Sequence, residues 1–391
     1  MDEQLNLPPD LYSQSLRERV ADEARRGAWD QAVEQVDQRT GGHVPKRQAE
    51  ALAVHVTQDF ETFYAEHRAA ANDTLSPGAL LVASSDSKGI RMLPEALREA
   101  TRKAAEDERK GAVRGDPMAN KKLRLHDRRM AIVTAVWEQE PHRRTAQQII
   151  DNLSRDPKAK QRKKALEDRA PRPQGKRLCA SVEKSQAEGV AEMFDELDRR
   201  DPSGGRTAVV LLDGEENQQT AILMQGSHRE RNLTLVLDII HVLHYLWCAG
   251  FALCGKDATK TDEWTVRFLE KLLTRPVKTV IADIQRSLAQ RALSASQRKP
   301  VDACIQYFTR NSAWMRYPEF LAAGLPIATG VIEGACRHLI QDRLGITGAR
   351  WGLPGAEAVL KLRALHSNGH WDEYWRFHRQ REATRNYQMA A

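Results

Sequence analysis

The sequence has few cysteines and no long apolar run. Its five cysteines are scattered and include no Cys-x-x-Cys pair, which argues against a disulfide framework or zinc knuckle and favours a reducing cytoplasm. The N-terminus carries early acids and no apolar segment, so we expect no signal peptide. The most apolar stretch, residues 233–254, is interrupted by Asp238, His241 and His244, whereas a spanning helix needs about 20 mostly apolar residues. We therefore expect buried core there and no membrane partner.

Several short catalytic motifs are also absent. The chain has no Gly-x-Ser-x-Gly, no P-loop pattern and no His-Glu-x-x-His, which disfavours hydrolase triads, P-loop ATP use and zincins. Its 391 residues suggest two or three domains with ample core. The net charge of +7 is the small difference between 60 basic and 53 acidic residues, and it permits a polyanionic partner without establishing one.

The basic excess is concentrated in residues 155–177. This segment holds ten Lys or Arg, including Lys163 and Lys164, against three acids, so it matches the net charge of the whole chain. Its prolines and Gly175 exclude a regular helix in its second half. It is either a solvated linker or an arm that lies along a phosphate backbone, and composition does not separate the two.

Residues 10–70 show helical periodicity. Gly41 and Gly42 end one expected helix, and Pro45 suits the first turn of the next, directly before Lys46 and Arg47. A helix, a turn and a helix with basic residues at its start fit a helix-turn-helix DNA reader. The alternative is a plain three-helix cap on the larger domain.

The middle of the chain predicts an α/β core. Residues 79–93 suggest two short strands joined at Asp86–Gly89, and residues 94–154 read as charged helical sequence. Residues 177–182 form a further strand candidate. Strands ending at Asp213 and at about Asp238 are each followed by a helix, and residues 255–325 are helical.

Three acids have a context that suggests chemistry. Asp86 and Asp213 follow apolar strands, and Glu333 opens a helix that begins at about Val331. Ligands of α/β sheets gather at the carboxyl ends of strands, and converging acids there could hold two divalent cations about 3.5–4 Å apart for phosphoryl transfer. Taken singly, each acid also has an ordinary structural role as a turn or first-turn residue.

Asp238 and His241 lie one helical turn apart in the segment after residue 237. They could support a metal site, either as ligands or as a pair that holds the ligands in place. Alternatively, they form an internal helix cap in which the two side chains bond to each other.

Several segments resemble one protein family in order along most of the chain. They are GVIEGACRHLIQDRLGITGARWGLPGAEAVLKLRAL (330–365), NGHWDEYW (368–375), VLDIIHVLHYLW (236–247), VVLLDG (209–214), GKRLCASVEK (175–184), HRRTAQQIIDNL (142–153), VASSDSKGI (82–90) and residues 15–52. The family is that of bacterial insertion-sequence transposases of the DDE class, ISKra type.

The resemblance implies an α/β, RNase H-like mixed sheet with helices, in which Asp86, Asp213 and Glu333 form the metal-binding catalytic triad. Asp238 and His241 would correspond to an accessory Asp-x-x-His motif after the fifth strand.

The resemblance also implies a domain organisation. Residues 1–75 would be a helical, helix-turn-helix-like DNA-binding domain. Residues 76–254 would be the first part of the catalytic core, with a basic insertion at about 94–175. Residues 255–325 would be a helical insertion, and residues 326–391 the C-terminal helices of the core.

The sequence departs from the family pattern beside each acidic motif. Ser87 stands where a Gly is common, Glu215 stands where a Trp is common, and Ile239 and Ile240 replace an aromatic. None of these changes removes a carboxylate, but Asp238 remains a competing candidate for the second catalytic Asp.

The expected activity is metal-dependent DNA cleavage and strand transfer at the ends of an insertion sequence, with two Mg²⁺ or Mn²⁺ ions. The expected partners are double-stranded DNA of the terminal inverted repeats and the target, and further copies of the chain in a homodimer or higher oligomer, in the bacterial cytoplasm at the nucleoid. Lys46, Arg47 and the arm would contact DNA, and Arg350 and Trp351 would contact or stack on it unless Trp351 is a packing residue. The alternative is a catalytically inactive, transposase-derived DNA-binding protein.

Overall fold

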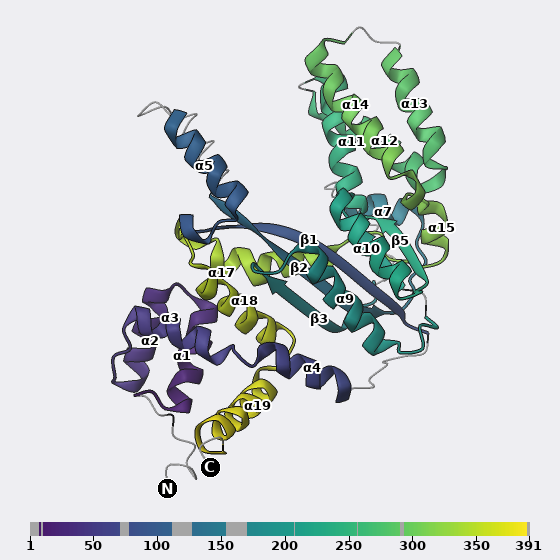
Figure 1. Ribbon diagram of the computed structural model, residues 1–391. Coiled ribbons are helices and arrows are strands. Elements are labelled where there is room, and N and C mark those ends of the chain that lie inside the picture. Colours follow the sequence, from purple (N-terminus) through teal and green to yellow (C-terminus); the bar gives the residue numbers. More distant parts are fainter. Residues whose placement is uncertain are drawn as a thin grey trace.

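The computed structural model describes residues 8, 11–70, 78–111, 127–153, 170–206, 208–255, 257–289 and 293–388. Helices surround a five-stranded mixed sheet, so this part of the chain is an α/β protein (Figure 1). The strands are β1 (Leu80–Arg91), β2 (Arg128–Gln139), β3 (Gln174–Ser181), β4 (Ala208–Leu212) and β5 (Leu233–Leu237).

The sheet has the strand order β3-β2-β1-β4-β5. The first three strands are antiparallel neighbours, and β4 and β5 run parallel to β1. All five residues of β4 are buried, as expected of a central strand that helices cover on both faces. The first and fourth strands therefore lie side by side in the middle of the sheet.

The helices fall into three groups along the chain. Those before β2 are α1 (Gln14–Arg26), α2 (Trp29–Thr40), α3 (Lys46–Val56), α4 (Phe60–Ala70) and α5 (Glu99–Gly111). Those between β2 and β5 are α7 (Ala146–Leu153), α9 (Gln186–Arg200) and α10 (Glu216–His228). Those after β5 are α11 (Ile239–Cys254), α12 (Ala258–Thr274), α13 (Val277–Ala289), α14 (Ala295–Arg310), α15 (Tyr317–Ala322), α16 (Gly330–Ala335), α17 (Asp342–Leu344), α18 (Leu353–Ser367) and α19 (Trp371–Ala383).

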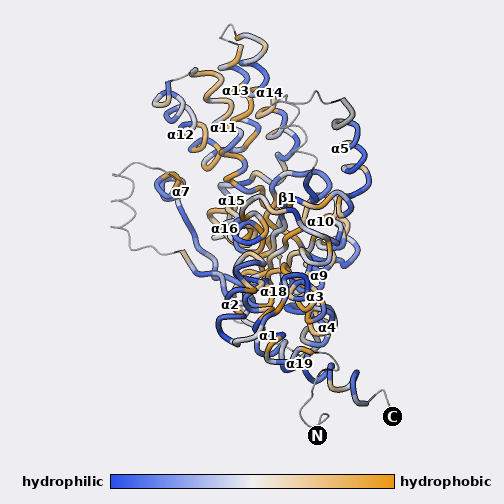
Figure 2. Tube along the Cα trace, turned by 90° about the vertical axis from the view of Figure 1, so that its left-hand side faces the viewer, coloured by the Kyte–Doolittle hydropathy of each residue, from blue (hydrophilic) through white to orange (hydrophobic). Residues whose placement is uncertain are grey.

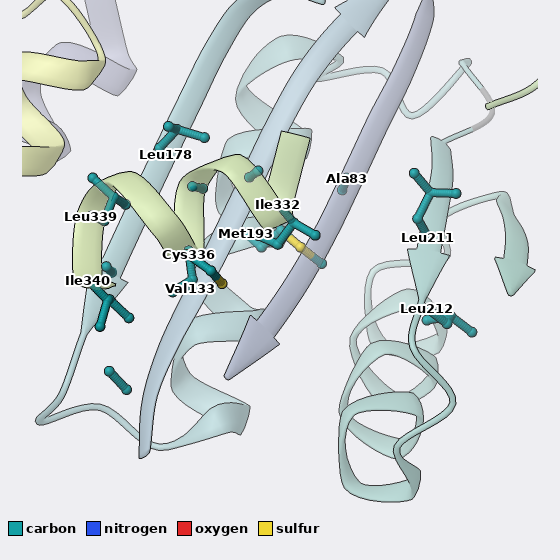
Figure 3. Packing of buried hydrophobic residues seen from close by; sticks show 14 of the residues in the cluster. Ala83, Val133, Leu178, Met193, Leu211, Leu212, Ile332, Cys336, Leu339 and Ile340 are labelled. Atoms are coloured by element: carbon teal, nitrogen blue, oxygen red, sulfur yellow. The ribbon is translucent and has the colours of Figure 1, made fainter. Parts of the chain in front are cut away.

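Different helices cover the two faces of the sheet. Ile132 and Val133 are consecutive in β2, so their side chains point to opposite faces. A Cβ on Gly189 of α9 would stand 2.7 Å from Ile132, which places α9 against that face. On the other face lie α16 and the π-helical segment Cys336–Gln341 that follows it (Figure 3). Ile332 and Cys336 point from this helix into the core.

The N-terminal helices α1, α2 and α3 pack against one another, and α1 and α3 also contact α18. A Cβ on Gly355 of α18 would stand 2.2 Å from the Glu50 carboxylate of α3, so the Glu50 side chain lies directly against the backbone of α18. Trp29 packs against Trp351, with ring centroids 6.2 Å apart. The Arg343 guanidinium lies 4.6 Å from the Trp351 ring. These helices therefore pack as one group against α18 and the segment around Trp351.

A buried ionic cluster ties the start of α4 to the C-terminal helix. The Asp59 carboxylate accepts hydrogen bonds from Arg385 at 2.7 Å and pairs with His378 Nδ1 at 2.7 Å. Burial alone would raise the pKa of Asp59, but these bonds outweigh it and hold that pKa well below its usual value. Glu382 is likewise buried, and its bonds with His55 and Arg385 lower its pKa to about 2.

Several expectations from the sequence are confirmed. β4 ends directly before Asp213, β5 ends directly before Asp238, and a helix follows each. The strand expected at residues 177–182 is β3. Gly41 ends α2 in the left-handed conformation, with φ of +68°. The part of residues 255–325 that the structure describes contains helices α12 to α15 and no strand. Hydrophobic stretches of the trace occur on α11 and α13 (Figure 2).

Two expectations about the strands were wrong. Residues 79–93 hold the one strand β1 rather than two, because residues 86–91 continue the antiparallel ladder with β2 as far as the pair Arg91 and Arg128. Residues 131–139 belong to β2 rather than to a helix. This strand lies inside the range 94–175 that was expected to be an insertion. Eight consecutive buried residues in β2 erase the alternation that would have revealed a strand.

In the part of the chain that the structure describes, every helix is too short or too polar to cross a bilayer.

Candidate active site

Asp86 lies within β1, not at its end as the sequence suggested, and it pairs with Val133 across the ladder. One carboxylate oxygen accepts a hydrogen bond from the Ser87 backbone N–H at 2.6 Å. The other accepts one from the Cys336 thiol at 3.3 Å. The side chain is thus held on the face of the sheet that α16 covers.

Asp213 follows β4 directly, and the sheet register brings it level with Asp86. β1 and β4 are paired in parallel with Ser84 opposite Leu211, and two further residues along each chain reach the two acids. The Tyr307 hydroxyl of α14 donates a hydrogen bond of 2.6 Å to the Asp213 carbonyl. Gly214 follows with φ of +91°, and a Cβ there would stand 2.6 Å from the Tyr307 ring, so glycine is required at this turn.

Burial is the main cause of a raised pKa for the Asp213 carboxyl, and the negative charge of Asp86 raises it further. The Glu215 backbone N–H, at 2.8 Å from the carboxylate, acts in the opposite sense. Asp213 is therefore harder to ionise than an ordinary aspartate.

Glu333 lies in α16 and reaches the same region from the helix. Burial raises the pKa of its carboxyl, followed by the negative charges of Asp238 and Asp86. The charge of Asp86 thus acts on both Asp213 and Glu333, and the Cys336 thiol, three residues after Glu333, touches Asp86, so the three acids belong to one region at β1, the end of β4 and α16.

Asp238 occupies a different kind of position from Asp213. It is fully buried and caps α11, where it accepts a hydrogen bond from the Ile240 N–H at 2.9 Å. It also accepts one from the Thr329 hydroxyl and pairs with His241 Nδ1 at 3.2 Å. The hydrogen bond with Asp238 is the main cause of a raised pKa for His241. Because its carboxylate is used internally, Asp238 positions α11, Thr329 and His241.

The donor set of the site suits a hard divalent cation. Carboxylate oxygens are the ligands that Mg²⁺ and Mn²⁺ prefer. Burial first, and neighbouring acids second, raise the pKa values of Asp213 and Glu333, and a bound cation would oppose both effects by favouring the ionised carboxylates. Among the described residues, no three His, Cys, Asp or Glu side chains already stand close enough to hold an ion.

The candidate DNA contacts are not gathered at this site. Lys46 and Arg47 begin α3 and are exposed, and Lys46 pairs with Asp30 at 2.8 Å. Lys163 and Lys164 lie outside the described residues. Residues 174–177 of the expected arm begin β3, and Arg177 is buried with its guanidinium 3.3 Å from the centre of the Tyr64 ring. That end of the segment is part of the sheet and not a free arm.

Trp351 is a packing residue rather than a stacking platform for DNA. Only 3% of its surface is exposed, and its indole N–H donates to the Leu344 carbonyl at 3.1 Å. Its backbone N–H and C=O bond to Arg91 and Leu93, which fixes the segment against the end of β1. The neighbouring Arg350 is exposed.

Three supporting residues were missed from the sequence. Cys336 and Thr329 lie three residues after and four before Glu333, so their place on the same helix was a usable signal. Tyr307 gave no local signal, because its contact with Asp213 spans 94 residues.

No protein-family model matches this chain, and none of the curated proteins is significantly similar to it.

Proposed function

We propose that this protein is a DNA transposase of the DDE class with an RNase H-like catalytic core, acting by metal-dependent cleavage and strand transfer at the ends of an insertion sequence. The observation that carries the proposal is that Asp86 and Asp213 lie level on adjacent strands and that Glu333 lies on the helix that covers Asp86. The three acids come from the first strand, from the end of the fourth strand and from a late helix, as the family resemblance requires. The mixed sheet, with antiparallel β1 to β3 and parallel β4 and β5, is compatible with an RNase H-like fold.

Asp86, Asp213 and Glu333 would hold two Mg²⁺ or Mn²⁺ ions. Such ions, when bound, activate a water or hydroxyl nucleophile and stabilise the leaving oxygen of a phosphodiester. The β1–β4 pairing orients the two aspartates, and the Cys336 thiol fixes one oxygen of Asp86.

Asp238 and His241 have a supporting part in this proposal. Asp238 holds His241 near the three candidate catalytic acids. The raised pKa of His241 favours its positively charged form beside Asp213. That charge limits the repulsion among the acids without occupying their oxygens.

Recognition of the element ends is assigned to the N-terminal helices. The exposed start of α3, with Lys46 and Arg47, would contact phosphates or bases, while the buried residues of α3 pack against the protein, with α18 among its contacts. The DNA partners would be the terminal repeats and the target, bound by a dimer or higher oligomer of this chain.

A nicking assay separates an active transposase from an inactive DNA-binding derivative. We expect Mg²⁺-dependent nicks at the junctions of DNA that carries the flanks of the coding sequence. Asp86→Asn and Glu333→Gln should abolish nicking and leave DNA affinity unchanged. Asp262→Asn, at an exposed position of α12, is the matched control and should nick like the parent. Salt-sensitive binding without Mg²⁺-dependent product at any protein concentration would reject catalysis and favour the inactive derivative.

A further inference from the structure

A cleft of about 470 Å³ lies beside α16, on the flank away from Glu333. Its floor includes Trp137 of β2 and Leu178 of β3, and Pro171 and Pro173 form part of its wall. Gly330, Val331, Gly334, Ala335 and His338 line it from the helix side. This set recurs at the spacing of one helical face, while Glu333 lies between its members on another face. The volume is within the range of about 300–1,000 Å³ that is typical of ligand sites.

The two glycines on this flank are not required by the fold. A Cβ on Gly330 or Gly334 would meet no atom within 4 Å, and neither residue has a positive φ. Glycine in a helix interior costs about 1 kcal/mol relative to alanine. The contrast is with Gly189, where an added Cβ would clash with Ile132. Small residues at these positions instead keep open the space into which a ligand could approach α16.

The charge of the cleft favours an anion. Its lining contains two cations, Lys176 and Arg144, and two histidines, His142 and His338, and the described residues that form it include no Asp or Glu. His338 Nδ1 pairs with Asp342, which is not part of the lining, at 3.2 Å. Lys176 is exposed and makes no hydrogen bond or ion pair within the described chain. Arg144 is held in place by bonds to the carbonyls of His142 and Leu325. A concave surface lined by one sign of charge concentrates ligands of the opposite sign.

We propose that this cleft binds the phosphodiester backbone of a DNA strand. The inference rests on the proposed function, since it supplies a DNA contact next to the catalytic carboxylates. DNA in the cleft would lie against one flank of α16 while Glu333 acts on the other. The helix would then separate the strand that is held from the phosphodiester that is cut.

Binding measurements with the full chain test the cleft directly. Fluorescence anisotropy with labelled single-stranded and duplex DNA of the same sequence, over a range of NaCl concentrations, compares the parent with Lys176→Gln and Gly334→Leu. We expect Lys176→Gln to weaken binding about 3- to 10-fold and to lower the salt slope by about one. Gly334→Leu should weaken binding by occupying the cleft. Lys278→Gln on α13 and Gly78→Leu, where a Cβ also meets open space, are matched controls and should bind like the parent.

The outcomes distinguish this inference from the proposed function. Unchanged affinity and salt slope for both cleft variants, in both DNA arms, would overturn it even if Mg²⁺-dependent nicking is present. A loss in the single-strand arm, the duplex arm or both supports it and identifies the form of DNA held. Cleft-dependent binding without nicking would uphold the cleft and reject the transposase proposal. If Gly334→Leu lowers the melting temperature, the surface variant Lys176→Gln decides.

Discussion

The contrast between Asp213 and Asp238 gives the sharpest prediction for stability. Asp238→Ala removes the cap of α11, which is the bond to the Ile240 N–H, and takes the acceptor away from Thr329 and His241. A lost cap costs about 0.5–2 kcal/mol, and a buried unpaired group such as the Thr329 hydroxyl about 1–3 kcal/mol. Because His241 is 43% exposed and can bond to water, we expect the free energy of unfolding to fall by about 2–5 kcal/mol.

Asp213→Asn should have the opposite effect at neutral pH. The pKa of the Asp213 carboxyl is raised in the folded protein, so the folded state binds its proton more tightly than the unfolded state does. Stability linked to this group is present below the pKa of the unfolded chain and is lost as pH rises through the folded pKa. An uncharged Asn also keeps an oxygen for the Glu215 N–H. We therefore expect Asp213→Asn to equal or exceed the parent at pH 7, without that advantage near pH 3.

Urea denaturation at pH 7 and pH 3 checks both effects, with Asp262→Asn as the exposed control. The reasoning is refuted if Asp213→Asn loses as much stability at pH 7 as Asp238→Ala does. It is also refuted if Asp238→Ala unfolds at the urea concentration of the parent.

Three further predictions follow from the packing and ionic contacts. Trp351→Ala should lower the free energy of unfolding, measured by urea denaturation, by about 3–5 kcal/mol and make the N-terminal helices more sensitive to proteolysis. Stability and protease resistance equal to those of the parent would contradict the packing role. Because the pKa values of Asp59 and Glu382 are lowered despite burial, their contribution to stability is present above about pH 4.5 and lost as pH falls toward 2. In Asp59→Asn the melting temperature should fall less steeply with decreasing pH than in the parent. An unchanged decrease would show that the ionic cluster does not cause the loss of stability in acid. Cys336→Ala should lower Mn²⁺ affinity, measured by electron paramagnetic resonance, roughly tenfold because Asp86 loses its hydrogen bond, whereas Cys336→Ser should bind Mn²⁺ like the parent. Equal affinities of Cys336→Ala and the parent would contradict this positioning role.

The local sequence was enough to predict the position of a residue that directly follows a recognisable strand or lies in a recognisable helix. Asp213 and Asp238 each follow a short apolar strand and precede a helix, so their position at the ends of strands could be read directly from the sequence. Glu333 could be placed on its helix by the same local reading.

Long-range pairing explains what could not be predicted. The polar residues around Asp86 resemble a turn, but pairing with β2, more than 40 residues away, keeps them in a strand. The thiol that holds Asp86 comes from Cys336, 250 residues later in the chain. Trp351 resembled a DNA-stacking residue because nothing nearby in the sequence reveals that Trp29 and Arg343 cover it.

Strand transfer by Asp213→Asn and Asp238→Asn decides which aspartate is catalytic. It is measured on end-containing DNA with Mg²⁺, at a temperature where both variants are folded. If Asp86, Asp213 and Glu333 form the catalytic site, Asp213→Asn yields no product although it binds DNA like the parent, and Asp238→Asn retains part of the activity. Retained transfer in Asp213→Asn together with its loss in Asp238→Asn would contradict the assignment.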